Sequence, residues 1–248
     1  MNYIVKLTTK VRATDLEPVE RRTGLLVLEP EDYTDAEIRT IRDKGYTVLG
    51  YLSVGSISIE RSWYRQYASY RLKRLEDWPK EFYMDLRKEP WQTFLVSRAG
   101  ELKAAGFDGW WLDNLDVYEE YRSPEMFDGC VSVLRSIRAL GGYVMVNGGS
   151  EFFDVALDRK LNLTELVNGV TQEEVFSLIK SYSGRGRFGK QSGGQSRFYQ
   201  SLLKRLRKCG VETFLLEYTR DGAVSAAIEE FCSKQSMTGY YISDDVDL

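Results

Sequence analysis

Carboxyl, carboxamide and hydroxyl side chains, which can form a polar active site, recur in this sequence at or just after the ends of short apolar runs. They are Asp113, Asn114 and Asp116, then Asn147, Glu173 and Glu174, Glu217 and Tyr218, and finally Asp244. An earlier run contributes Tyr51 and Ser53. Residues that follow parallel strands gather at one edge of the fold. A helix cap or a buried salt bridge could explain one or two of these acids, but their recurrence predicts a carboxylate-based active site.

Two of these carboxyl groups, on Asp113 and Glu173, have the placement that glycoside hydrolysis requires. They end the fourth and sixth apolar runs, and neighbouring strands lie about 4.8 Å apart, so the two backbones would be roughly 10 Å apart. Side chains that lean inward reduce this to roughly 5–9 Å, the range of glycosidase carboxylate pairs. The adjacent Glu174 leaves the second position open by one residue.

The sequence contains no histidine. This excludes Ser-His-Asp and Cys-His catalysis, zinc held by histidine, and histidine acid–base chemistry. Two carboxylates can hydrolyse a glycosidic bond with neither histidine nor metal, so we expect no metal site and no cofactor. A metal-dependent enzyme that holds Mg²⁺ with the same acids is an alternative.

Composition narrows the function classes further. The 248 residues carry a net charge of −3, which argues against nucleic acid as a partner. No stretch approaches the roughly 20 apolar residues of a membrane span, and the N-terminus lacks the apolar run of a signal peptide. The chain as written predicts a soluble cytoplasmic protein without membrane contact, unless it is a trimmed piece. The three cysteines are far apart and predict free thiols.

Eight apolar runs alternate with longer amphipathic segments along the chain. Most are continuously apolar, as in parallel strands covered by helices, and none resembles a polar edge strand. They predict a single (β/α)8 barrel over residues 1–248. The runs are Tyr3–Leu7, Gly24–Glu29, Thr47–Gly55, Phe107–Asp116, Tyr143–Gly149, Glu165–Glu173, Thr213–Thr219 and Gly239–Asp244.

Helical periodicity, with polar caps before and glycine after, fills several of the gaps. The helices expected are Thr34–Gly45, Pro90–Gly106, Pro124–Gly142, Ser196–Gly210 and Ser225–Gln235. Asp108, at the start of its strand, is expected to support a turn. Two irregular zones, Ser58–Lys88 and Ser183–Ser196, should lie beside the strand C-termini, where barrel enzymes place substrate loops. The second contains a G-x-G-x-x-G pattern, which we interpret as a mobile basic loop because no strand leads directly into it.

Four motifs appear in a fixed order along the chain. They are VLGYLSVGSIS at Val48–Ser58, GFDGWWLDNLDVYEEY at Gly106–Tyr121, VNGG at Val146–Gly149 and NGVTQEEVF at Asn168–Phe176. Together they make the chain resemble glycoside hydrolase family 114, the endo-α-1,4-polygalactosaminidase-like barrels. The motif at Gly106–Tyr121 is the most specific of the four. The resemblance extends from the second strand to the eighth.

The resemblance implies a barrel that cleaves partly deacetylated, cationic galactosaminoglycans. It matches the family's strand-four Asp to Asp113 and its strand-six Glu to Glu173. Similar barrel glycosidases use the first as nucleophile and the second as general acid/base. The leading prediction is therefore a retaining endo-glycosidase acting on an amino-sugar polymer. A carbohydrate-binding barrel without catalysis is a second possibility, but it would need one of these two acids to be missing.

The remaining polar and aromatic residues at the predicted mouth fit a sugar ligand, because sugars bind by stacking on aromatic rings and by polar contacts. Acids beyond the pair would attract an ammonium group. Of the neighbours Trp110 and Trp111, one should face the barrel and the other the helices. The residues predicted to bind substrate are Tyr51, Ser53, Asn114, Asp116, Tyr118, Asn147, Glu217, Tyr218 and Asp244.

Overall fold

The computed structural model describes residues 1–21 and 23–248. Its centre is a closed barrel of eight parallel strands in the order β1-β13-β12-β9-β8-β7-β3-β2. All eight coincide with the predicted apolar runs, although several runs extend beyond their strands. The strands are β1 (Asn2–Lys6), β2 (Gly24–Leu28), β3 (Tyr46–Ser53), β7 (Gly109–Asp113), β8 (Tyr143–Asn147), β9 (Gly169–Glu173), β12 (Glu212–Tyr218) and β13 (Gly239–Ser243). The single (β/α)8 barrel is confirmed.

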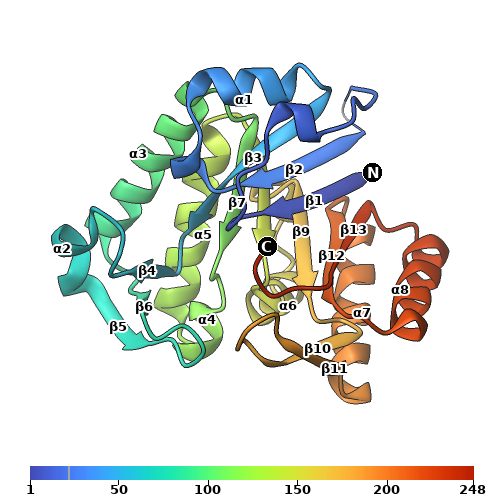
Figure 1. Ribbon diagram of the computed structural model, residues 1–248. Coiled ribbons are helices and arrows are strands. Elements are labelled where there is room, and N and C mark those ends of the chain that lie inside the picture. The colour runs from blue at the N-terminus through green and yellow to red at the C-terminus, as the bar shows by residue number, and fades with distance from the viewer. Residues whose placement is uncertain (22) are drawn as a thin grey trace.

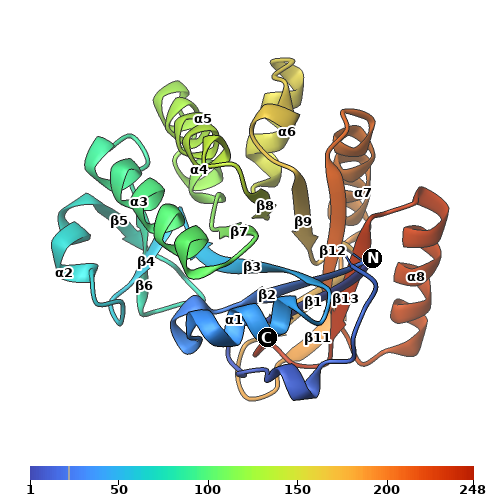
Figure 2. The same ribbon diagram turned by 90° about the horizontal axis from the view of Figure 1, so that it is seen from above.

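Helices cover the outside of the barrel, as Figures 1 and 2 show. The longer ones are α1 (Asp35–Arg42), α3 (Glu89–Ala105), α5 (Pro124–Ala139), α6 (Ser150–Asp158), α7 (Gly193–Lys208) and α8 (Gly222–Gln235). Two further helices are single turns, α2 (Tyr64–Tyr67) and α4 (Val117–Glu120). The sequence did not predict α6, and the link between β1 and β2 contains a 3-10 turn (Ala13–Asp15) in place of a full helix. No helix of the described chain is long and apolar enough to cross a membrane.

Local capping explains where several helices begin and end. Thr34 accepts a hydrogen bond from the Glu37 amide at 3.4 Å, and the Glu37 carboxylate accepts one from the Thr34 amide at 2.8 Å. This reciprocal arrangement satisfies N–H groups that the first turn of α1 leaves free. At the C-terminal end of α3, Gly106 adopts a φ of 108°, a left-handed conformation that glycine tolerates without strain. These signals are local, which is why the sequence predicts these boundaries.

The barrel strands separate two apolar layers. Trp111 lies inside the barrel, where its Nε1 donates to Tyr3 Oη at 3.0 Å. Trp110 points into the helix layer and donates to the carbonyl of Ala99 in α3 at 2.9 Å. Adjacent strand residues face opposite sides, so this pair follows the expected alternation. Asp108 supports the start of β7 by accepting from Val48 N at 3.0 Å.

The two zones predicted to be irregular are folded. The first contains a three-stranded antiparallel sheet, β4-β6-β5, built from Ser56–Ser58, Glu81–Met84 and Arg71–Arg74. In the second, β11 (Arg187–Lys190) pairs with β10 (Ser177–Ser181) as an antiparallel hairpin, so a strand does precede the glycine pattern. The loop prediction failed there because the hairpin forms by cross-strand pairing, which short polar segments do not signal. Both units follow barrel strands at their C-terminal ends.

Candidate active site

A cleft of about 470 Å³ opens at the C-terminal ends of the barrel strands. This volume is in the range of about 300–1,000 Å³ that is usual for ligand sites. The barrel, the β4-β6-β5 sheet, the β10–β11 hairpin and the C-terminal segment all contribute to its walls. Of the residues predicted from the sequence, the cleft is lined by Tyr51, Asp113, Asn114, Asp116, Asn147, Glu173 and Tyr218.

One asparagine joins the two predicted catalytic carboxyl groups at the base of the cleft. Asn147 Nδ2 donates to Asp113 Oδ1 at 3.0 Å and to Glu173 Oε1 at 2.5 Å. The two carboxyl oxygens therefore lie no more than about 5.5 Å apart, the length of both bonds end to end. The side chains come from three consecutive barrel strands, β7, β8 and β9. Because each residue ends its strand facing the barrel axis, the three polar groups converge.

The Asp113 carboxylate receives further hydrogen bonds. Tyr51 Oη and Asn114 Nδ2 each donate to Asp113 Oδ2 at 3.1 Å. Burial raises the pKa of Asp113, while the donors from Asn147, Asn114 and Tyr51 lower it again. Hydrogen-bond donors stabilise the ionised form of a carboxyl group. These donors oppose the effect of burial in part, and the pKa of Asp113 remains above its ordinary value.

The carboxyl group of Glu173 is in a different environment. Its Oε2 accepts from Tyr218 Oη at 2.9 Å, and its Oε1 accepts from Asn147. Burial, followed by the charge of Asp113, raises the pKa of Glu173 to about 8. The neighbouring Asp113 carboxylate disfavours a second negative charge at this distance. With a pKa of about 8, Glu173 holds its proton at neutral pH beside the hydrogen-bonded Asp113, as acid-assisted displacement requires of the group that donates the proton.

The structure separates the roles of the adjacent glutamates. Glu174 has a φ of 57°, so the chain turns sharply after β9. Its carboxylate accepts a hydrogen bond from the backbone N–H of Ile179 in the β10 strand. Asn147 and Tyr218 both bond to Glu173, so this residue, and not Glu174, is the one paired with Asp113.

Two more of the predicted residues act close to the pair. Ser53 Oγ accepts from Asn114 Nδ2 at 3.0 Å and thereby orients the amide that contacts Asp113. Asp116 lines the cleft and accepts from the Gly149 amide at 3.0 Å. Burial, followed by the charge of Asp113, raises the pKa of Asp116 to about 6 despite that bond.

Besides Ser53, which does not line the cleft itself, three residues predicted to bind substrate lie outside it. Tyr118 is buried in the helix layer, where its ring packs against Phe127 and Phe152. Glu217 is fully buried on the outer face of β12 and accepts from Ser177 N at 2.9 Å and Ser177 Oγ at 2.5 Å. Asp244 is 68% exposed at its side chain and pairs with Arg185. These residues were predicted from their positions at or near strand ends, and such positions do not show the direction in which each side chain points.

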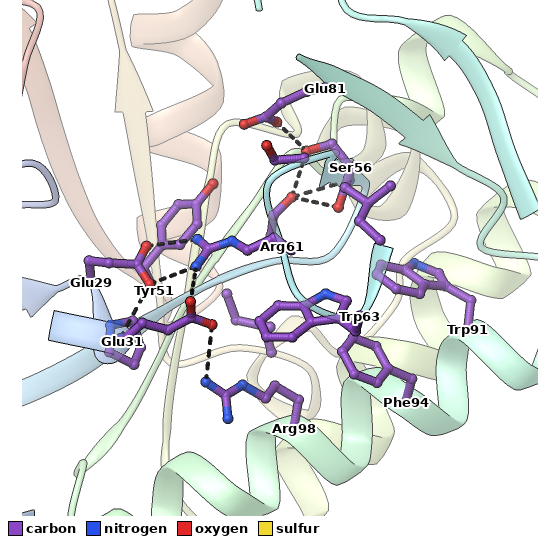
Figure 3. A pocket seen from close by; sticks show the side chains of 15 residues that line it. Glu29, Glu31, Tyr51, Ser56, Arg61, Trp63, Glu81, Trp91, Phe94 and Arg98 are labelled. Atoms are coloured by element: carbon purple, nitrogen blue, oxygen red, sulfur yellow. Dashed lines mark hydrogen bonds and ion pairs between the residues drawn. The ribbon is translucent and has the colours of Figure 1, made fainter. Parts of the chain in front are cut away.

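The cleft also contains residues that the sequence did not single out. Glu81 on β6 accepts from Ser56 Oγ at 2.6 Å, and burial raises its pKa. Arg61 forms a bidentate pair with Glu29, at 2.9 and 2.7 Å, and lies 3.3 Å from Glu31. Figure 3 shows the Arg61 guanidinium directed at these two carboxylates. Only the folding of the β4-β6-β5 sheet brings Arg61 and Glu81 to the barrel mouth.

Another group of cleft residues, outside the set predicted to bind substrate, is aromatic. Trp78 and Tyr182 lie on the loops beside the mouth, and Tyr199 lies on α7. The abundance of aromatic residues in Ser58–Lys88 was a signal for the first of these. No comparable pattern marks the other two. The described residues contain no group of three or more His, Cys, Asp or Glu side chains arranged to hold a metal ion.

Solved structures of low sequence identity share this fold. The glycoside hydrolase domain of PelA from Pseudomonas aeruginosa superposes with a TM-score of 0.78, at 18% identity over 100% of this chain and 96% of that one. Aspergillus fumigatus Ega3, solved in complex with galactosamine, gives a TM-score of 0.72 at 13% identity over 98% of this chain and 90% of that one. At these identities the likeness establishes the barrel fold.

Sequence comparison with curated proteins adds one relative. An uncharacterized protein of Deinococcus radiodurans is 27% identical over 123 residues, which cover 46% of this chain. The match spans 38% of that relative's own length. A family model matches far more of the chain, from residue 3 to residue 243. The chain therefore belongs to glycoside-hydrolase family GH114 and is a glycoside hydrolase.

Proposed function

We propose that this chain is a retaining endo-glycosidase that cleaves a partly deacetylated galactosamine-containing polysaccharide. The observation that carries the mechanism is the bridge from Asn147 to both Asp113 and Glu173, which holds the two carboxyl groups within about 5.5 Å. Retaining enzymes have carboxyl groups about 5–5.5 Å apart, whereas inverting enzymes need about 6.5–9.5 Å to admit water between them. The short separation favours retention.

In the first step, an Asp113 oxygen attacks the anomeric carbon, and the bond from that carbon to the glycosidic oxygen breaks. Glu173 gives its proton to the departing oxygen, and a glycosyl ester forms on Asp113. In the second step, the Glu173 carboxylate takes a proton from water, whose oxygen attacks the same carbon and releases Asp113. Both residues return to their starting states, so the cycle needs no other reactant. Tyr51, Asn114 and Asn147 hold Asp113 for the attack.

The charge of the cleft supports a cationic sugar. Among its described lining residues the one cationic side chain is Arg61, and it pairs with Glu29 and Glu31. Seven lining side chains carry carboxyl groups: Glu29, Glu81, Asp113, Asp116, Glu173, Glu174 and Asp247. A concave site dominated by one sign of charge concentrates ligands of the opposite sign. The Ega3 structure contains galactosamine, which is consistent with an ammonium-bearing substrate here.

A purified-protein assay tests the proposal. The protein should release oligomers from deacetylated galactosamine polymers and much less from the fully acetylated or neutral polymers. NMR of the first product should show the anomeric configuration of the substrate. Asp113→Asn and Glu173→Gln should each lose at least about 10³-fold in kcat. Asp128→Asn and Glu229→Gln on exposed helix surfaces are matched controls.

Two outcomes would reject parts of the proposal. An inverted first product would rule out Asp113 as a covalent nucleophile, even if hydrolysis is observed. Full activity of Glu173→Gln together with loss in Glu174→Gln would place the acid one residue later. The non-catalytic alternative needs one acid to be missing, and both are present and share Asn147.

A further inference from the structure

Two exposed aromatic side chains meet above the catalytic cleft. Trp78 is 48% exposed and Tyr182 is 37% exposed, and both line the cleft. Their ring centroids are 5.3 Å apart at an interplanar angle of 60°, an edge-to-face contact. Large aromatic side chains normally gain stability by burial, so a pair left exposed at the rim of a site suggests a ligand that covers it.

The two rings come from opposite loops. Trp78 lies in the turn between β5 and β6, in the unit that follows β3, and Tyr182 lies in the hairpin that follows β9. In the barrel, β3 and β9 are separated by β7 and β8, the strands that end in Asp113 and Asn147. The ring contact therefore connects the unit that follows β3 with the hairpin that follows β9, across the ends of β7 and β8. The pair and the catalytic carboxyl groups line the same cleft.

Both turns are held in place by hydrogen bonds to their backbone carbonyls. The carbonyl of Trp78 accepts from the Glu81 amide at 2.9 Å, and the carbonyl of Glu81 accepts from the Leu75 amide at 3.0 Å. The tip of the hairpin is fastened by Arg220, which donates to the carbonyl of Gly186 at 3.2 Å. The rings are thus presented by ordered turns, while the contact between them is one aromatic pair that a ligand can replace.

The surroundings of the pair favour a charged sugar. Glu174 also lines the cleft. Burial raises the pKa of Glu174 and of Tyr182, and nearby negative charges add to it: that of Asp77 for Glu174, and those of Glu174, Glu173 and Asp77 for Tyr182. Two carboxyl groups therefore lie close to the rings. An indole face packs against the C–H face of a pyranose ring, and adjacent carboxylates pair with an ammonium group on that sugar.

We propose that Trp78 and Tyr182 form a second sugar-binding subsite that encloses the substrate chain and makes the enzyme prefer long polymers. This rests on the proposed function, because it assumes a galactosamine polymer in the cleft. A short oligomer reaches the catalytic pair without filling the subsite, whereas a long chain occupies both. The aromatic pair should therefore contribute to affinity only for longer chains.

Binding to a catalytically silent background tests this inference. In Glu173→Gln protein, calorimetry would measure the affinity for galactosamine oligomers from two to about ten sugar units. Adding Trp78→Ala or Tyr182→Ala should weaken the longest oligomers about tenfold and the disaccharide much less. Tyr240→Ala is the matched control, because Tyr240 is 38% exposed and does not line the cleft. Trp78→Phe keeps an aromatic face and should recover most of the affinity.

The outcomes separate this inference from the proposed function. Equal losses at every length, or long-chain affinity unchanged in both alanine variants, would overturn the subsite. A loss of the same size in Tyr240→Ala would show a general effect of aromatic removal and would also overturn it. If the Glu173→Gln parent and the control bind no galactosamine oligomer at all, the substrate assignment is wrong and the subsite fails with it.

Discussion

Removing the charge of Asp113 should change the titration of Glu173 by an amount that the geometry bounds. The Asp113 and Glu173 oxygens are at most about 5.5 Å apart. At an effective dielectric constant of about 20, two unit charges at this distance repel by about 3 kcal/mol. One pH unit corresponds to about 1.4 kcal/mol. The Asp113→Asn substitution should therefore lower the pKa of Glu173, which is about 8 in the native protein, by about 2 pH units.

The substitution isolates the electrostatic cause because asparagine is nearly isosteric with aspartate and leaves the burial of Glu173 in place. The measurement is a carbon NMR titration of protein labelled at the glutamate carboxyl carbons. The Glu173→Gln spectrum assigns the signal, and Asp128→Asn is the control. Since burial is the largest cause of the raised pKa, the variant should still titrate above an ordinary glutamate.

Two results would refute this reasoning. A native Glu173 that titrates near the ordinary glutamate value would show that burial and Asp113 do not keep it protonated at neutral pH. An unchanged titration in Asp113→Asn would show that the charges do not interact, so the two groups could not divide the roles of acid and nucleophile as proposed. In the native enzyme, the alkaline limb of the activity profile should follow the same pKa of about 8.

Three further predictions follow from the structure. The folded-state pKa of Glu173 lies above its unfolded value, so ionising this residue lowers the free energy of unfolding as pH rises from about 4.5 towards 8. In parallel unfolding titrations, Glu173→Gln should therefore gain up to about 5 kcal/mol in free energy of unfolding relative to the native protein at pH 9. Glu217→Gln removes the carboxylate that accepts from Ser177 and should cost about 1–3 kcal/mol in denaturant unfolding, and an unchanged midpoint would contradict its role as a buried acceptor. Raising the salt concentration should increase KM for a cationic polymer by screening the acidic cleft, while KM for a neutral oligomer should stay constant.

The sequence by itself determined the barrel and Asp113 as one of the paired acids, and it left the second acid between Glu173 and Glu174. Continuous apolar runs separated by capped amphipathic segments predict parallel strands under helices, because burial on both faces leaves no polar alternation. Thr34 and Gly106 mark helix ends through contacts within a few residues, which a sequence pattern records. Asp113 and Glu173 end the fourth and sixth runs of this pattern, on either side of the run that ends near Asn147, so the barrel topology alone was sufficient to predict that they converge.

Only the tertiary structure decided which neighbouring side chains enter the cleft. Glu217 and Tyr218 are adjacent on β12, yet Tyr218 contacts Glu173 while Glu217 points outward to Ser177, since successive strand residues face opposite sides. The positions of Glu81, Trp78 and Tyr182 depend on how the β4-β6-β5 sheet and the β10–β11 hairpin fold over the mouth of the barrel. Their contacts join residues far apart in the chain, and no local propensity records such a meeting. The barrel is therefore determined by repeated local patterns, and the walls of its cleft by long-range packing.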